Sequence, residues 1–156
     1  MNLTVIQQEL IKALNGSQSH IPCINIIQDF PVDKINSRID EVPYTPWELV
    51  EHMRLTQFDI LDYIRNPLYK ESVWPDAYWP EKGKKATADQ WDNTVKQFTE
   101  DLKSLEQIAA DPKTDLTAPL VHNPNHTVLR EILIVGNHNS YHSGQLLIFK
   151  RVLKIY

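Results

Sequence analysis

Two histidines in the C-terminal quarter of the chain have the spacing of metal ligands on a helix. His138 and His142 are four residues apart, so a helix would place both imidazoles on one side, one turn apart. Two imidazoles in that arrangement can bind the same divalent ion. The pair alone is a weak signal, because buried histidines often serve only as hydrogen-bond partners.

A third histidine supports the metal interpretation. His52 lies on the apolar stripe of a different predicted helix, where a buried polar ring is costly unless a partner satisfies it. One divalent ion held by His52, His138 and His142 would satisfy all three rings. Three protein ligands leave one coordination position open, which is typical of catalytic metal sites. Imidazole also suits iron and copper, and we expect zinc or nickel.

Gln145 is the candidate for a supporting role. It follows His142 by three residues on the same helix face, so it can orient that histidine or contact a substrate. An interhelical amide hydrogen bond is an equally weighted alternative. The catalytic groups themselves are not identified by any spacing or motif.

Other chemically active side chains lack such a pattern. His20, His122 and His126 fall outside the periodic stripes and are expected to be solvent-exposed. Cys23 has no cluster of basic neighbours that would lower its pKa, and we expect a small buried residue. The aromatic segment at residues 74–80 can cover a pocket, although packing across the end of the helices is the expected role.

Periodic apolar residues predict the helices that must position these groups. Four principal helices are predicted at residues 3–15, 46–66, 88–110 and 128–156, with a shorter helical stretch at 21–28. The first helix is predicted from the stripe Leu3, Ile6, Leu10 and Ala13. The stripe of the last helix comprises Val128, Val135, His138, His142, Gln145, Phe149 and Val152.

Three of these helices have clear start signals. Thr45-Pro46-Trp47-Glu48 combines an N-cap threonine, a proline at the first helical position and a glutamate that completes a capping box. Thr87 and Gln90 repeat the capping box, and Thr127 is the expected N-cap of the last helix. No run is typical of a strand, so the sequence predicts an all-α fold, a four-helix bundle with a long connection at residues 67–86.

The composition limits the classes of function. The chain has 156 residues, matching one domain over residues 1–156, and its net charge of -4 argues against nucleic-acid binding. No apolar run is long enough to span a membrane, and polar residues interrupt residues 1–15, unlike a signal peptide. A single cysteine forms no intrachain disulfide, so we expect a reducing compartment, the cytoplasm.

These motifs resemble the DinB-like or YfiT-like family of metalloenzymes. The resemblance spans nearly the whole chain and is carried by residues 46–52, the aromatic segment at residues 74–80, and residues 137–145 with the sequence NHNSYHSGQ. It implies a four-helix bundle, a divalent metal, often zinc or nickel, on His52, His138 and His142, and frequent homodimers. The family name refers to damage-inducible expression and implies no DNA binding.

The predicted function follows from an ion with an open position. Such an ion can polarise a carbonyl, acidify water or hold a thiol as its thiolate. Members of the superfamily resemble transferases or isomerases that use bacillithiol, mycothiol or glutathione. The leading hypothesis is therefore a metal-dependent transferase in which the ion activates a low-molecular-weight thiol for attack on an electrophilic small molecule, in stress defence or detoxification.

Two other functions stay open. The chain can be a metal-binding or dimerisation module without turnover, which a fourth protein ligand would favour. It can also be a metal-dependent hydrolase, although Asn139 occupies the place of the glutamate in the HExxH motif. A hydrolase would need a carboxylate base from elsewhere, for which Glu48, Glu51 and Glu131 are the candidates.

Overall fold

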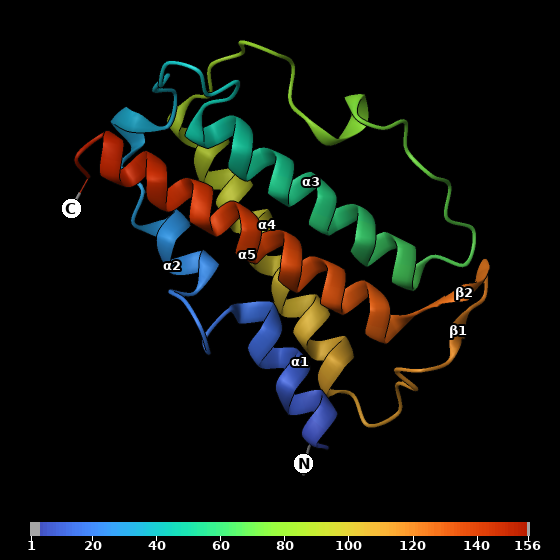
Figure 1. Ribbon diagram of the computed structural model, residues 1–156. Helices are drawn as coiled ribbons and strands as arrows, with labels where there is room; N and C mark the ends of the chain where they lie inside the picture. The colour runs from blue at the N-terminus through green and yellow to red at the C-terminus, as the bar shows by residue number, and fades with distance from the viewer. Residues whose placement is uncertain (1–3, 156) are drawn as a thin grey trace.

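The computed structural model describes residues 4–155, and its architecture is all-α apart from one small pair of strands (Figure 1). The four long helices are α1 (Val5–Asn15), α3 (Pro46–Arg65), α4 (Ala88–Ala110) and α5 (Val128–Val152). The shorter elements are α2 (Cys23–Gln28), the 3-10 turns η1 (Val32–Lys34) and η2 (Asp76–Tyr78), and the strands β1 (Pro119–Leu120) and β2 (Asn123–Thr127).

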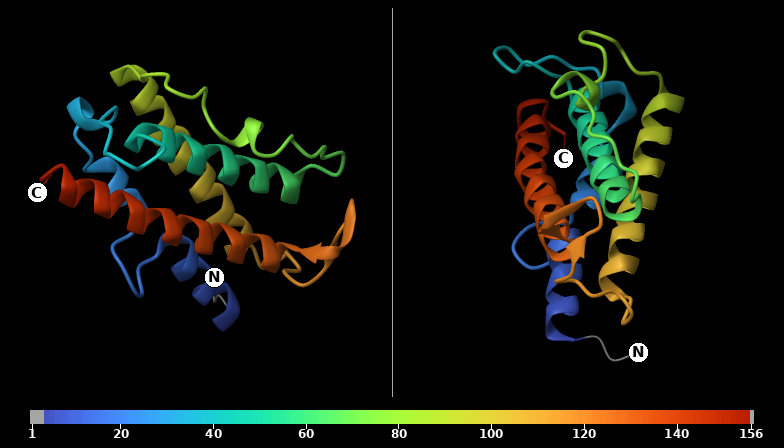
Figure 2. Two further views of the ribbon diagram at one scale, coloured as in Figure 1. Left: turned by 45° about the horizontal axis from the view of Figure 1, so that its top comes forward. Right: turned by 90° about the vertical axis from the view of Figure 1, so that its right-hand side faces the viewer.

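The long helices pack as a bundle around one buried core. Helix α5 contacts both α1 and α3, and these two helices in turn contact α4, which closes the ring (Figure 2). The largest buried side chains come from all four helices, among them Leu14, Leu49, Phe98 and Phe149. Burial of these apolar surfaces is the main stabilising contribution, and it fixes α3 and α5 side by side.

The predicted helix starts are confirmed. Thr45 accepts a hydrogen bond from the backbone N–H of Glu48 at 3.2 Å, and the Glu48 carboxylate accepts one from the Thr45 N–H at 2.6 Å. Thr87 and Gln90 form the same reciprocal pair at the start of α4, and Thr127 caps α5. These caps satisfy backbone N–H groups that have no partner within the helix.

The predicted buried face of the first helix is confirmed at Leu10 and wrong at Ile6. Leu3 lies outside the described residues, and Ile6 is 55% exposed, whereas Gln7, Leu10 and Leu14 are buried. The reason is the polar end of the helix. Gln7 completes a capping box with Thr4 and also donates to the Asp111 carbonyl. These hydrogen bonds hold Gln7 at the inward position that the apolar pattern assigns to Ile6.

The all-helical reading also missed the strands, and it extended the last helix too far. Strand β1 pairs antiparallel with β2, with Pro119 opposite Thr127. The pair is too short and too rich in proline and asparagine to show alternating hydrophobicity. Helix α5 ends at Val152, which is 54% exposed and does not belong to the buried stripe. Within residues 4–155, no helix has the length and apolar character needed to cross a bilayer.

We predict that Thr45→Ala lowers the free energy of unfolding by about 1–2 kcal/mol, because it removes the side-chain cap of the helix that carries His52. Urea denaturation followed by circular dichroism would measure the change. Thr45→Ser keeps the hydroxyl and should lose much less. Equal destabilisation by alanine and serine would show that the lost methyl contact, and not the cap, causes the effect.

Candidate metal centre

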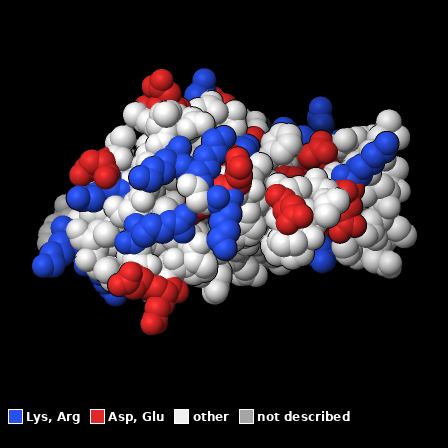
Figure 3. All heavy atoms as spheres, turned by 90° about the horizontal axis from the view of Figure 1, so that it is seen from above, with Lys and Arg blue, Asp and Glu red and all other residues white. Residues whose placement is uncertain are grey.

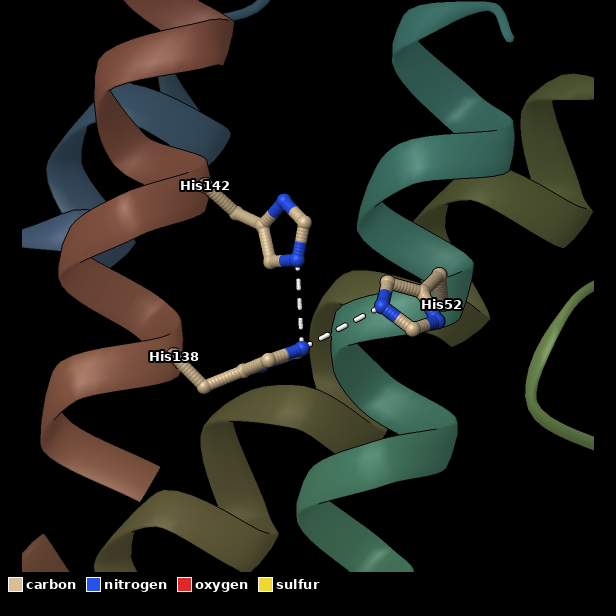
Figure 4. A group of neighbouring side chains, drawn as sticks. All are labelled: His52, His138 and His142. Atoms are coloured by element: carbon tan, nitrogen blue, oxygen red, sulfur yellow. Dashed lines mark hydrogen bonds between the residues drawn. The ribbon is translucent and has the colours of Figure 1, made fainter. Parts of the chain in front are cut away.

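Helices α3 and α5 bring the three predicted histidines together. His52 comes from α3, and His138 and His142 come from successive turns of α5, with all three rings directed toward one point (Figure 4). The Nε2 atom of His138 lies 3.2 Å from Nε2 of His52 and 3.1 Å from Nε2 of His142. Within residues 4–155, no other histidine, cysteine, aspartate or glutamate belongs to this group.

The separations between these nitrogens suit a common metal ion. One ring nitrogen from each histidine lies within 4.8 Å of the others. Two imidazole nitrogens bound at about 2.0–2.1 Å to a tetrahedral ion are about 3.3 Å apart. The 3.2 Å and 3.1 Å separations therefore match two edges of such a site, and small side-chain movements would adjust the third.

Two of the rings are held with their Nε2 lone pairs toward the centre. His52 donates its Nδ1–H to the backbone carbonyl of Tyr78 at 2.7 Å. His142 donates its Nδ1–H to Oε1 of Gln145 at 2.6 Å. A ring protonated on Nδ1 and neutral overall has a bare Nε2, which is the form that binds a metal. Gln145 thus makes the contact expected of a residue that orients a ligand.

The three nitrogens cannot satisfy one another without an additional cation. With His52 and His142 in these tautomers, Nε2 of His138 can donate one proton to only one of its two neighbours. The remaining lone pairs then face each other between the buried His52 and His142 and the half-buried His138. Burial, together with His142 and His52, lowers the pKa of His138 to about 3, and burial also lowers the pKa of His52 and of His142. Near neutral pH, a divalent ion fits this donor set better than a proton does.

The aromatic segment lies over His52 and not across the end of the bundle, which corrects the expected role. Its backbone runs beside α3 in Figure 1. The Trp79 ring stacks on the His52 imidazole with centroids 3.9 Å apart and planes within 3°. Tyr44 also stacks on Trp79, with centroids 5.4 Å apart. Trp74 approaches the His52 edge at 6.4 Å although its own side chain is 65% exposed. Trp79 therefore restricts the orientation of His52 and shields it from water.

Sequence reasoning missed both contacts that this segment makes with the site. The carbonyl of Tyr78 is a backbone group, so no residue type signals its role. The tryptophans were visible as a cluster, but their position against α3 depends on the path of a long connection. The one available signal was that a buried histidine ring needs a flat packing partner, which a tryptophan such as Trp79 can supply.

A chain of buried amides ties the site to the rest of the bundle. The Asn139 amide on α5 donates to Gln57 on α3 at 3.0 Å, and Gln57 donates to the Phe98 carbonyl on α4 at 2.7 Å. All three side chains are at least 98% buried. Such interior hydrogen bonds are strong when fully made and specific in geometry. They fix the relative positions of the two helices that carry the histidines.

The three histidines expected at the surface are in fact half-buried, so that expectation is wrong. His20 contacts the Ser140 hydroxyl at 2.9 Å. His126 contacts the Tyr63 hydroxyl at 2.7 Å, and the His122 ring packs edge-on against Tyr63. The strands bring His122 and His126 onto the ends of α3 and α5, which local periodicity does not reveal.

One further expectation concerns Cys23, and one further residue, Tyr141, lies beside the site. Cys23 is buried, as predicted, and burial raises the pKa of its thiol to about 11, which leaves it unreactive near neutral pH. Tyr141 is 66% exposed, and its ring lies beside His142 with centroids 5.0 Å apart. It therefore forms part of the rim of the site and packs little into the bundle.

Comparison with known proteins gives one match. The family model described as the DinB superfamily matches residues 24–146, a range that includes all three converging histidines. No curated protein matches the chain, and no solved structure matches it.

We predict that Gln145→Ala weakens metal binding about 10- to 100-fold, because the His142 ring loses the acceptor that holds its Nδ1–H. Competition with a chromophoric chelator would measure the affinity. Gln145→Glu keeps an acceptor at the same place and should retain most of the affinity. If alanine binds metal as tightly as wild type, or if glutamate is as weak as alanine, Gln145 does not orient His142.

Proposed function

This chain belongs to the DinB superfamily, and from that premise we propose that it is a metal-dependent transferase that uses a low-molecular-weight thiol. In the proposal, His52, His138 and His142 hold one zinc or nickel ion, and an electrophilic small molecule is the second substrate. The thiol is of the bacillithiol, mycothiol or glutathione type, and the role is detoxification or stress defence. The observation that carries the proposal is the convergence of three imidazole nitrogens, two from buried histidines and one from the half-buried His138.

The donor set supports thiol chemistry because all three ligands are uncharged. The hydrogen bonds from His52 to Tyr78 and from His142 to Gln145 keep each ring in the neutral form with Nε2 free. When bound, a divalent ion would keep its full charge and lower the pKa of a nearby thiol, so that the thiolate forms near neutral pH. The absence of a fourth such ligand in residues 4–155 supports an open site over a closed structural one.

Hydrolysis is less well supported, because each candidate carboxylate is committed elsewhere. Glu51 binds Arg54 and the Thr94 hydroxyl, and Glu131 binds Arg130. Glu48 accepts from the backbone of Thr45 and Gly83 and pairs with Arg38. Burial by itself raises the pKa of Glu48, but these hydrogen bonds and the charge of Arg38 outweigh it and keep the pKa below its ordinary value.

A glutamate held in this way is a poor base for a bound water, because each of its partners would have to be released. None of the three belongs to the histidine group.

An apolar cavity beside Trp79 supports the choice of an electrophile with a hydrophobic body. The cavity has a volume of about 330 Å³ and is lined by Pro43, Tyr44, Glu48, Trp79, Pro80 and Lys82. Trp79 forms part of its wall and also stacks on His52. Aromatic and apolar walls are typical of small-molecule sites. Trp79 therefore connects this cavity to His52, a proposed ligand of the ion.

The test is a titration of cobalt-substituted protein with 2-mercaptoethanol at pH 7. We expect a thiolate-to-cobalt charge-transfer band, because cobalt accepts the same imidazole and thiolate ligands and absorbs visibly. The band should reach saturation at pH 7, although this pH lies below the pKa of about 8.5 of an ordinary cysteine thiol.

Ethylene glycol, which replaces sulfur by oxygen, is the matched control and should give no such band. An unchanged spectrum with protein that retains its cobalt would contradict thiol binding. Glutathione and bacillithiol would then be compared with 2-mercaptoethanol, and turnover of an electrophile such as a halogenated arene would be followed with the tightest binder.

A further inference from the structure

A second cavity lies between α3, α5 and the strands, separate from the three histidines. Its volume is about 430 Å³. Asp59 and Glu131 line it, each seven residues from a histidine of the metal centre on the same helix. Seven residues are two helical turns, or about 10 Å along the axis. The cavity therefore lies about two helical turns along α3 and α5 from the metal centre.

Aromatic rings form much of the cavity wall. Tyr63 stands perpendicular to both Tyr69 and His122, with centroids 4.8 Å and 4.5 Å away. Tyr69 and Tyr78 also line the cavity and donate their hydroxyls to the Asp59 carboxylate at 2.9 Å. Burial raises the pKa of both tyrosines, so they remain neutral hydroxyl donors. The faces of such rings attract cations.

The charged groups of the cavity leave an excess of negative charge. Arg130 binds the carboxylate of Glu131, so these two charges offset each other. Asp59 and Glu71 form no ion pair with a lysine, arginine or histidine in the part of the chain that the structure describes. Figure 3 shows acidic and basic side chains interspersed toward one end of the face it draws, while the largest group of basic side chains lies nearer the other end.

An anionic occupant is disfavoured by the same groups. The guanidinium of Arg130 is already engaged with Glu131. Nδ1 of His126 lies 2.7 Å from the Tyr63 hydroxyl and 3.7 Å from the Glu131 carboxylate, so Glu131 would also offset a positive charge on that ring. Neither group offers a free positive charge to a phosphate or carboxylate.

We infer that this cavity binds the protonated amine of a small organic molecule, with the ammonium near Asp59 and Glu71 and the hydrocarbon part against the tyrosine rings. Two carboxylates without an ion-pair partner, beside aromatic rings, are the chemistry that recognises an organic cation. Tyr78 lies between the two sites, since its carbonyl holds His52 and its hydroxyl holds Asp59. The occupant therefore lies next to the metal centre, but its binding requires no metal.

The test uses the full chain labelled with ¹⁵N and titrated with benzylamine, followed by two-dimensional NMR. Benzyl alcohol has nearly the same shape without the charge, and benzoate carries the opposite charge. We expect benzylamine to shift the backbone signals of Asp59, Tyr69 and His122 and to bind at least tenfold more tightly than either analogue, the effect of about one charge-assisted hydrogen bond. Equal binding of the alcohol, tighter binding of benzoate, or shifts confined to other surfaces would overturn the inference.

Two variants make the result specific. Glu71→Gln removes one carboxylate that makes no hydrogen bond or ion pair in the described structure, so it should leave the fold intact and weaken benzylamine binding about tenfold. Asp92→Asn makes the same charge change on the exposed surface of α4 and should have no effect. If both variants weaken benzylamine binding equally, the amine is attracted only by the overall negative charge of the protein, and the inference is wrong. Repeating the titration with metal-free protein separates this result from the metal proposal.

Discussion

Three uncharged imidazole nitrogens face one another between α3 and α5, and the surrounding structure is arranged to keep them there. Nε2 of His138 lies 3.2 Å and 3.1 Å from its neighbours, and no assignment of protons in neutral rings satisfies all three. An arrangement of this kind destabilises a protein that lacks a cation, because lone pairs are buried without donors. The bundle must therefore hold the rings rigidly, and a bound ion would turn the same geometry into a stabilising interaction.

The supporting contacts come from every side of the site. The Tyr78 carbonyl and the Gln145 amide fix the tautomers, and Trp79 covers one ring. In the bundle core, the Asn139 amide donates to Gln57, and Gln57 donates to the Phe98 carbonyl on α4. These two hydrogen bonds set the spacing of the helices. The Tyr78 segment also borders the acidic cavity, so one connection between α3 and α4 shapes both the metal centre and the neighbouring pocket. Tyr78 and Trp79 are therefore the parts of this connection that pack against the bundle, while most of its other residues are exposed.

The sequence predicts the convergence of the histidines because the relevant information is local. Spacing of four residues places His138 and His142 on one face, and the apolar neighbours of His52 turn it inward. Contacts that depend on the path of irregular chain were not predictable. The stacking of Trp79, the carbonyl of Tyr78 and the two strands all arise from tertiary packing, which leaves no periodic pattern.

Metal content tests the central claim most directly. Elemental mass spectrometry on tag-free protein would compare wild type with His52→Ala, His138→Ala and His142→Ala, each checked for fold by circular dichroism. The account predicts about one equivalent of zinc or nickel in wild type and its loss in every variant. Folded wild-type protein that binds no transition metal even after reconstitution would contradict it, because the three histidines would then be a polar network of the core.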